Sequence, residues 1–316
     1  MRATDNVIGI FAADIHLSHK PPVWRSAEPD WYAAMKRPLD EIFEIQKQFD
    51  CPVIYAGDIF DRWNSPAELI NFAIANLPIG YAIPGQHDLP LHNYEDMKKS
   101  AYWTLIQSHV LNYMHPANPT IVEKDVKNHK MLVFGYPFGY GIETIEHRTD
   151  DHIYIAVLHE YCWIDGHTYP GAPKENRLAR NASKFIDGRW KGYDVVVYGD
   201  NHKGFMVEDK NIKTTFLNCG TLMRRKSDEI DYRPQIGLLL DTGKIISHKL
   251  DISQDKYLIS DKPINEEEKM DLSDFIKELE LLGDTALDYE VAMEQYHLSN
   301  KTKKAVKIII TKAMEK

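Results

Sequence analysis

Five short motifs of acidic, imidazole and amide side chains are the chemically most informative part of this 316-residue chain. Each motif directly follows a run of residues that favours a β-strand. The motifs are Asp14-Ile15-His16, Gly57-Asp58-Ile59-Phe60-Asp61, Gly85-Gln86-His87-Asp88, His159 and Gly199-Asp200-Asn201-His202. In open α/β sheets, ligands bind beyond the carboxyl ends of strands, where loops from neighbouring strands converge. The motifs therefore predict a metal site that is assembled from distant parts of the chain.

The residue types and spacings in these motifs suit a pair of divalent cations. Asp14 and His16, two residues apart on one loop, can both reach a single ion, and Asp58 can bridge two ions through its two carboxylate oxygens. Mn²⁺, Mg²⁺ and Fe²⁺ accept such mixed carboxylate and imidazole ligands. Two ions about 3.5–4 Å apart can hold a shared hydroxide as nucleophile and clamp phosphoryl oxygens. His87, with Asp88 next to it, is suited to protonate the departing oxygen.

The segments between the motifs alternate between strand and helix patterns in the first half of the chain. Helices are expected at 31–49, from an N-cap at Ser65 to about residue 76, and at 93–109. This order indicates βαβ units and a largely parallel sheet. Strands are expected in the second half at 130–135, 153–158, 195–198, 213–217, 236–241 and 244–250, the last two forming a hairpin, with one helix at 175–186.

Composition places the chain among ordinary globular proteins and predicts a cytoplasmic location. Three scattered cysteines favour a reducing compartment over a disulfide framework. No apolar run approaches the roughly 20 residues that a bilayer span needs, so no membrane association is expected. The net charge of −9 counts mildly against an extended passive grip on nucleic acid. A carboxylate-rich site loaded with two cations would, however, reduce that charge.

The pattern of the chain changes near Ser260, which predicts two domains. Residues 1–258 are expected to form the catalytic domain, and 259–316 a helical extension of three short helices. The apolar face of this extension is too large to remain exposed to water. It is therefore either a cap packed on the sheet or a segment that docks a partner.

The ordered motifs DxH, GDxxD, GxHD, H and a final GxxH resemble those of the calcineurin-like metallophosphoesterases. The resemblance implies a two-sheet α/β/β/α sandwich core, with one metal held by Asp14, His16, Asp58 and His202. It implies a second metal at Asp58, Gln86, His159 and Asp200, and a general acid, His87, paired with Asp88. Mn²⁺ is the expected metal, with Mg²⁺, Fe²⁺ and Zn²⁺ as alternatives.

Two positions depart from the family pattern, and both affect the second metal. Gln86 replaces the family's asparagine, and Asp200 replaces the first histidine of its GHxH motif. The longer amide and the charged oxygen should shift this site toward Mn²⁺ or Mg²⁺, or weaken it. Neither change removes a ligand, so an active enzyme is expected. Asp61, the last residue of GDxxD, is expected to orient a ligand or loop.

Residues 218–225 together with Glu229 resemble the GSxxR…E stretch of SbcD-type nucleases. That resemblance implies a DNA nuclease, encoded by a bacterium or by a phage and active in the host cytoplasm. It also implies an SbcC-like ABC ATPase partner, bound through the C-terminal helices, and a homodimer. Candidate substrate contacts are His19, Arg62, Arg224 and Arg225, although an exposed loop or a solvated turn explains them equally well.

Three functions remain open at the level of the sequence. The first is a two-metal DNA nuclease with His87 as general acid. The second is a phosphoesterase for a cyclic nucleotide, a nucleotide or a phosphoprotein, which the acidic composition favours. The third is a non-catalytic, metal-binding subunit of an SbcC-like ATPase complex, which the two altered ligands of the second metal would permit.

Overall fold

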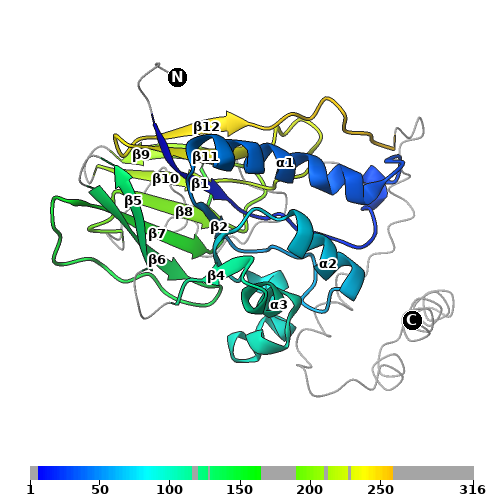
Figure 1. Ribbon diagram of the computed structural model, residues 1–316, viewed down its shortest axis with the longest axis horizontal. Helices are drawn as coiled ribbons and strands as arrows, with labels where there is room; N and C mark the ends of the chain where they lie inside the picture. Colours follow the sequence, from blue (N-terminus) through cyan, green and yellow to red (C-terminus); the bar gives the residue numbers. More distant parts are fainter. Residues whose placement is uncertain are drawn as a thin grey trace, which may run out of the picture. The chain divides into compact units, whose positions relative to one another are not determined.

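The computed structural model describes two facing β-sheets with helices packed against one of them (Figure 1). It describes residues 6–115, 120–126, 129–164, 190–209, 213–226 and 229–258. The helix expected at 175–186 and the extension at 259–316 lie outside the described residues. Among the described residues, no helix combines the length and the apolar character needed to cross a bilayer.

The first sheet has a parallel centre and an antiparallel edge. Its strand order is β12-β11-β1-β2-β3-β4, with parallel pairing from β1 to β4 and antiparallel pairing of β11 with both β1 and β12. The strands are β1 (Val7–Ala12), β2 (Val53–Ala56), β3 (Gly80–Ile83), β4 (Leu111–Tyr113), β11 (Gln235–Leu240) and β12 (Ile245–Lys249). The expected hairpin between β11 and β12 is confirmed, and so is the parallel pairing expected for the first half of the chain; β11 and β12 add an antiparallel edge to it.

The second sheet also has a parallel centre, and its strand order is β5-β6-β7-β8-β10-β9. Its four central strands are parallel, and β5 and β9 pair antiparallel at the two edges. The strands are β5 (Thr120–Val126), β6 (His129–Tyr136), β7 (His152–His159), β8 (Val195–Gly199), β9 (Phe205–Asp209) and β10 (Thr214–Asn218). Parallel central strands bring the carboxyl ends of β6, β7, β8 and β10 to one edge of the sheet.

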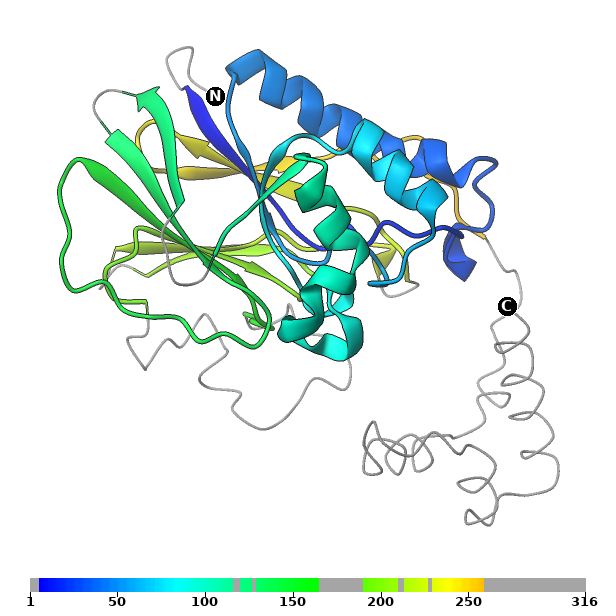
Figure 2. The same ribbon diagram turned by 60° about the horizontal axis from the view of Figure 1, so that its bottom comes forward.

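Apolar side chains on alternate faces of the strands build separate cores. Ile8, Phe11 and Ile54 of the first sheet pack against Val157 and Val197 of the second, which makes the layer between the sheets. The opposite faces of β1 and β2 pack against the helices α1 (Trp31–Phe49), α2 (Ala67–Asn76) and α3 (Ala101–Gln107). Figure 2 shows these helices side by side over the first sheet. The expected sandwich of two sheets is therefore confirmed.

Helix α1 has the predicted bounds, 31–49, whereas the other two helices begin at different residues than the sequence predicts. Pro66, not Ser65, is the N-cap of α2, and the Ser65 hydroxyl donates a hydrogen bond back to the carbonyl oxygen of Arg62. The single helix predicted at 93–109 is instead a 3₁₀ segment, η4 (Tyr94–Lys99), followed by α3. Ser100 separates them with extended backbone, and its hydroxyl caps α3 by accepting from the Trp103 amide.

Candidate metal centre

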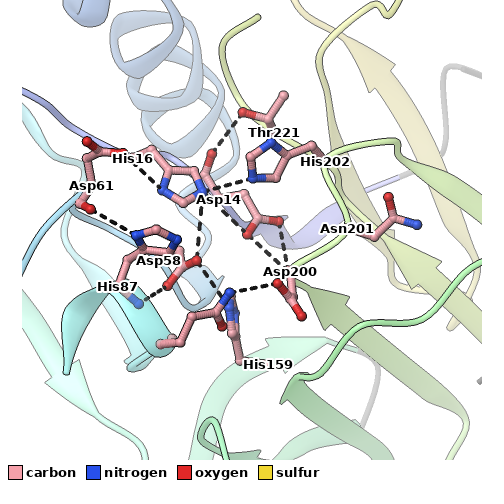
Figure 3. Close-up of polar contacts among 12 residues, drawn as sticks. Asp14, His16, Asp58, Asp61, His87, His159, Asp200, Asn201, His202 and Thr221 are labelled. Carbon is pink, nitrogen blue, oxygen red and sulfur yellow. Dashed lines mark hydrogen bonds and ion pairs between the residues drawn. The ribbon is translucent and has the colours of Figure 1, made fainter. Parts of the chain in front are cut away.

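The loops that follow β1 and β2 are tied together as a continuation of the parallel ladder. The Asp14 amide donates to the carbonyl oxygen of Gly57 at 3.1 Å, and the His16 amide donates to that of Asp58 at 3.0 Å. These bonds place the first two motifs beside each other. His159 ends β7, and Asp200 follows β8, so parallel pairing delivers them to the same region (Figure 3).

Four of the expected ligand residues have left-handed backbone conformations. The φ angles are 50° at Asp14, 49° at His16, 54° at Asp58 and 86° at Asp200. Such conformations are unfavourable for residues other than glycine and persist where the surrounding structure enforces them, as at catalytic and ligand-binding sites. The strain turns the chain sharply at the strand ends, so that side chains from the three loops after β1, β2 and β8 converge.

The converging side chains present their ligand atoms to each other at close range. The Nε2 atoms of His16 and His202 lie 3.0 Å apart. Oδ2 of Asp58 lies 3.7 Å from Nε2 of His16 and 3.3 Å from Nε2 of His159. Figure 3 shows the Asp58 carboxylate between these two imidazole rings. Asp58 thus has the position of a ligand shared between two adjacent cation sites.

Neighbouring acceptors fix which nitrogen of each histidine faces the centre. Nδ1 of His159 donates to the carbonyl oxygen of Ala56 at 2.6 Å, and Nδ1 of His202 donates to Oε1 of Glu229 at 2.8 Å. Since Nδ1 carries the proton in both rings, Nε2 is left as the metal-binding atom. Glu229 also accepts from the main-chain amides of Arg225 and Lys226, which holds its carboxylate in place.

Gln86 and Asp200, the two residues that depart from the family pattern, contact each other. The Gln86 side-chain amide donates to Oδ1 of Asp200 at 2.7 Å. The main-chain amide of Asp200 donates to both carboxylate oxygens of Asp14, at 3.0 and 3.1 Å. The two replacements are therefore complementary: the side chain of Gln86 is longer than the family's asparagine, that of Asp200 is shorter than the family's histidine, and the two still meet.

The donor set fits divalent cations. Asp14, His16, Asp58 and His159 are buried. The buried Gln86 Oε1 accepts no hydrogen bond, and Asp58 Oδ2 and His159 Nε2 are paired with each other at 3.3 Å. Burying unpaired polar atoms is costly, and metal coordination is one way in which proteins satisfy them. Three groups among the described residues bring potential ligand atoms together: Asp14 with His16 and His202, His16 with Asp58 and His87, and Asp14 with Asp58 and His159.

The buried carboxylates of the centre also favour an additional positive charge beside them. Burial raises the pKa of Asp14 to about 6, even though His159 and His202 oppose this change. Burial alone would lower the pKa of His159, but the nearby Asp58 carboxylate outweighs it and raises the pKa to about 10. The carboxylates thus recruit a proton onto an imidazole that is placed as a ligand. A bound cation would take over the charge of that proton.

His87 lies at the centre, but its predicted pairing with Asp88 is wrong. Nδ1 of His87 contacts the main-chain oxygen of Asp61 at 2.9 Å, and its ring packs edge-on against His16 at 4.9 Å. The buried Asp88 carboxylate instead accepts from the main-chain amides of Ile59, Phe60 and Gly85. Asp88 therefore holds the second and third motifs together, and the main-chain oxygen of Asp61 orients the His87 ring.

The four candidate substrate contacts have different surroundings. Arg225 donates to Oδ1 of Asp61 at 2.7 Å, which places it beside the centre, and Arg62 is an exposed residue next to Asp61. Nδ1 of His19 contacts the Tyr32 hydroxyl at 2.9 Å. The sequence predicts Arg224 at the surface, and this prediction is wrong. Its buried guanidinium donates to the carbonyl oxygen of Ile230 and pairs with Asp255.

The sequence comparison agrees with this geometry. A family model described as calcineurin-like phosphoesterase matches residues 10–204, which contain all five motifs. The chain belongs to the calcineurin-like phosphoesterase family. It is a metal-dependent phosphoesterase whose described residues contain groups that can hold divalent cations. No curated protein matches the chain significantly.

Several solved structures of phosphoesterases and related enzymes are similar to this calcineurin-like phosphoesterase. An archaeal phosphodiesterase is 15% identical, with 77% of this chain and 99% of that chain covered and a TM-score of 0.36. A metallophosphoesterase from Sphaerobacter thermophilus is 14% identical, with 78% and 89% covered and a TM-score of 0.36. The calcineurin-like phosphoesterase YfkN from Bacillus subtilis is 12% identical, with 81% and 89% covered and a TM-score of 0.42. At these scores the structural likeness carries no argument about function.

Proposed function

We propose that this calcineurin-like phosphoesterase hydrolyses phosphodiester bonds of DNA with two bound Mn²⁺ ions. The observation that carries the phosphodiester chemistry is the position of Asp58 between the Nε2 atoms of His16 and His159, with His87 alongside. Asp14, His16, Asp58 and His202 would hold one ion, and Asp58, Gln86, His159 and Asp200 the other. When bound, such ions supply Lewis acidity toward a phosphoryl group and a nucleophile at neutral pH.

The protein's own residues provide orientation and the proton. Nδ1 of His87 faces the Asp61 carbonyl oxygen and so carries a hydrogen, which leaves Nε2 to hold the proton that is transferred. That proton passes from Nε2 to the oxygen that leaves phosphorus as the ester bond breaks. Arg225, held by the Asp61 carboxylate, is placed to face a phosphate group at the same edge of the centre.

DNA as substrate is supported by the loop that carries Arg225. Glu229 in this loop contacts the ligand His202, so residues that resemble the GSxxR…E stretch of SbcD-type nucleases are part of the metal centre. The exposed Arg62 adds a second cationic group next to Asp61. An SbcC-like ATPase that binds through residues 259–316, and a homodimer, remain part of this proposal.

Two other functions each have one observation in their favour. The acidic sequence, with a net charge of −9, favours a small phosphate ester over a polyanionic strand. The hydrogen bond between Gln86 and Asp200 favours a non-catalytic, partner-binding subunit, because it engages one carboxylate oxygen of Asp200, an expected ligand of the second ion.

The test is Mn²⁺-dependent turnover of linear single- and double-stranded DNA, compared with bis(p-nitrophenyl) phosphate and cyclic nucleotides. DNA degradation that chelator and His87→Ala both abolish is the expected result. Hydrolysis of small diesters alone would replace DNA with a small substrate. Binding of Mn²⁺ without hydrolysis of any substrate would leave the partner-binding subunit as the function.

A further inference from the structure

The loop that follows His87 exposes two side chains in an energetically unfavourable conformation. Leu91 and His92 both have left-handed backbone, with φ angles of 50° and 58°. Leu91 is 70% exposed, whereas Leu89 is fully buried and Pro90 is buried beside it. The buried pair anchors the loop, and the strained pair turns outward. Since neither residue is glycine, this conformation has a cost that solvent exposure of Leu91 does not offset.

A second loop, at the end of β6, places aromatic rings beside the first. The Phe138 amide donates to the carbonyl oxygen of Pro84, two residues before Gln86, so this loop is attached to the strand that leads into the metal centre. The rings of His92 and Phe138 are 6.0 Å apart in an edge-on arrangement. Tyr140, which is 40% exposed, packs against Tyr94 at 4.8 Å.

We call Leu91, His92, Phe138 and Tyr140 the aromatic rim. The rim begins three residues after Asp88, and therefore adjoins the general acid along the chain. Neither 89–94 nor 137–142 contains Asp or Glu, although Glu95 and Glu143 directly follow these two stretches. The side chains of the rim themselves therefore add no negative charge that would repel a polyanionic strand.

We propose that the aromatic rim is a stacking surface for the nucleobases next to the scissile phosphodiester. The planar rings of His92, Phe138 and Tyr140 can stack on any base, and this kind of contact is tolerant of sequence; Leu91 adds apolar contact beside them. The strained turn at Leu91 and His92 directs these two side chains outward. The hydrogen bond between the Phe138 amide and the Pro84 carbonyl oxygen fixes the second loop to the segment that leads to His87. This inference rests on the proposed nuclease function and specifies which part of the substrate the protein holds.

The direct test compares an ordinary single-stranded oligonucleotide with an abasic one of equal length. Both carry the same phosphates, so the ratio of their kcat/KM values reports on the bases alone. Wild-type protein should prefer the ordinary strand by about tenfold or more. The double variant Leu91→Gly with His92→Gly should lower this ratio, although Phe138 and Tyr140 remain in place. Glycine accepts positive φ, so these changes remove the side chains and relieve the strain.

A binding measurement without turnover accompanies the kinetics. In a His87→Ala background, an oligonucleotide with 2-aminopurine should lose fluorescence on binding, and the double glycine change should restore part of it. Tyr140→Phe should keep the quenching, and Tyr140→Ala should weaken it. Ile79→Ala is the matched control, since Ile79 is 61% exposed and precedes β3 at the opposite end from the metal centre.

The outcomes separate this inference from the proposed function. An unchanged preference for bases in the double glycine variant, with wild-type cleavage intact, would overturn the stacking surface and leave the nuclease in place. Wild-type protein that cleaves neither strand, but hydrolyses a small diester, would overturn both. Equal losses in the double glycine variant on the ordinary and abasic strands would show that the rim binds no base.

Discussion

The ring of His87 is oriented by the main-chain oxygen of Asp61, which lies 2.9 Å from Nδ1. The carboxylate of Asp61 is occupied separately by Arg225. A carbonyl oxygen is uncharged at any pH. It therefore fixes the hydrogen of His87 on Nδ1 without placing a negative charge against the ring. The arrangement supports the proposal that His87 acts as general acid without a carboxylate partner.

His87→Ala should reduce kcat by about 10²- to 10⁴-fold, because a positioned acid contributes on that order to proton transfer. The proposed metal ligands are unchanged in this variant, so its metal content should remain that of the wild type. Metal analysis beside steady-state kinetics checks both statements. His109→Asn, an exposed histidine with the same left-handed backbone, is the control and should leave kcat unchanged. Normal turnover by His87→Ala would remove it from the mechanism.

Asp88→Asn should act on stability and not on the proton transfer. The carboxylate accepts three main-chain hydrogen bonds in a buried position, and an asparagine amide group would present donors where acceptors are needed. We expect a loss of about 2 kcal/mol in the free energy of unfolding, measured by urea denaturation. A catalytic partnership with His87 would instead appear as a large loss of kcat in a protein of unchanged stability.

Gly85→Ala should displace the shared ligand. A Cβ atom at this position would lie 2.2 Å from Oδ1 of Asp58 and 2.6 Å from its main-chain nitrogen. Since both atoms are held by the surrounding loops, Asp58 must move, and the affinity for Mn²⁺ should fall at least tenfold. Calorimetric titration gives the affinity. Gly141→Ala is the matched control, because nothing lies within 4 Å of its added Cβ. Equal affinities of the two variants would contradict the prediction.

Glu229→Gln should weaken the metal site that His202 completes. The charge of Glu229 supports the Nδ1 hydrogen of His202, and such partners of metal-bound histidines contribute about 10- to 100-fold in affinity. Activity should therefore require more Mn²⁺ but approach the wild-type kcat at saturation. Metal titration of the rate provides the measurement, with the exposed Glu208→Gln as control. A lower kcat at saturating metal, with unchanged affinity, would show that Glu229 acts elsewhere.

The sequence predicts well which side chains meet at the strand ends, because the ends of buried strands are easy to recognise. The apolar runs before Asp14, Asp58 and Asp200 are β1, β2 and β8. The strands that were missed, β4, β5 and β9, all lie at sheet edges. β4 has three residues, and β5 contains Glu123, Lys124 and Asp125, so neither has the apolar signal of a central strand.

The partners of the ligands are much harder to predict, because they come from distant positions. The contact between Arg225 and Asp61 joins residues 164 positions apart, and that between Glu229 and His202 spans 27. Arg224 and Arg225 are neighbours in the sequence, but Arg224 is buried against Asp255, whereas Arg225 contacts Asp61 beside the metal centre. Only tertiary packing separates them. Similarly, adjacency suggested Asp88 as the partner of His87, whereas the turn directs its carboxylate toward amides.

The central claim is that Asp58 is a ligand of two cations at once. Its most direct test is the Mn²⁺ stoichiometry of the purified wild-type protein and of Asp58→Ala, by elemental analysis after dialysis against a known free-metal concentration. We expect two ions per chain in the wild type and a loss affecting both sites in the variant, in a chain that circular dichroism shows to be folded. Two ions retained by Asp58→Ala, or loss of a single ion with the other bound at full affinity, would contradict the bridging role.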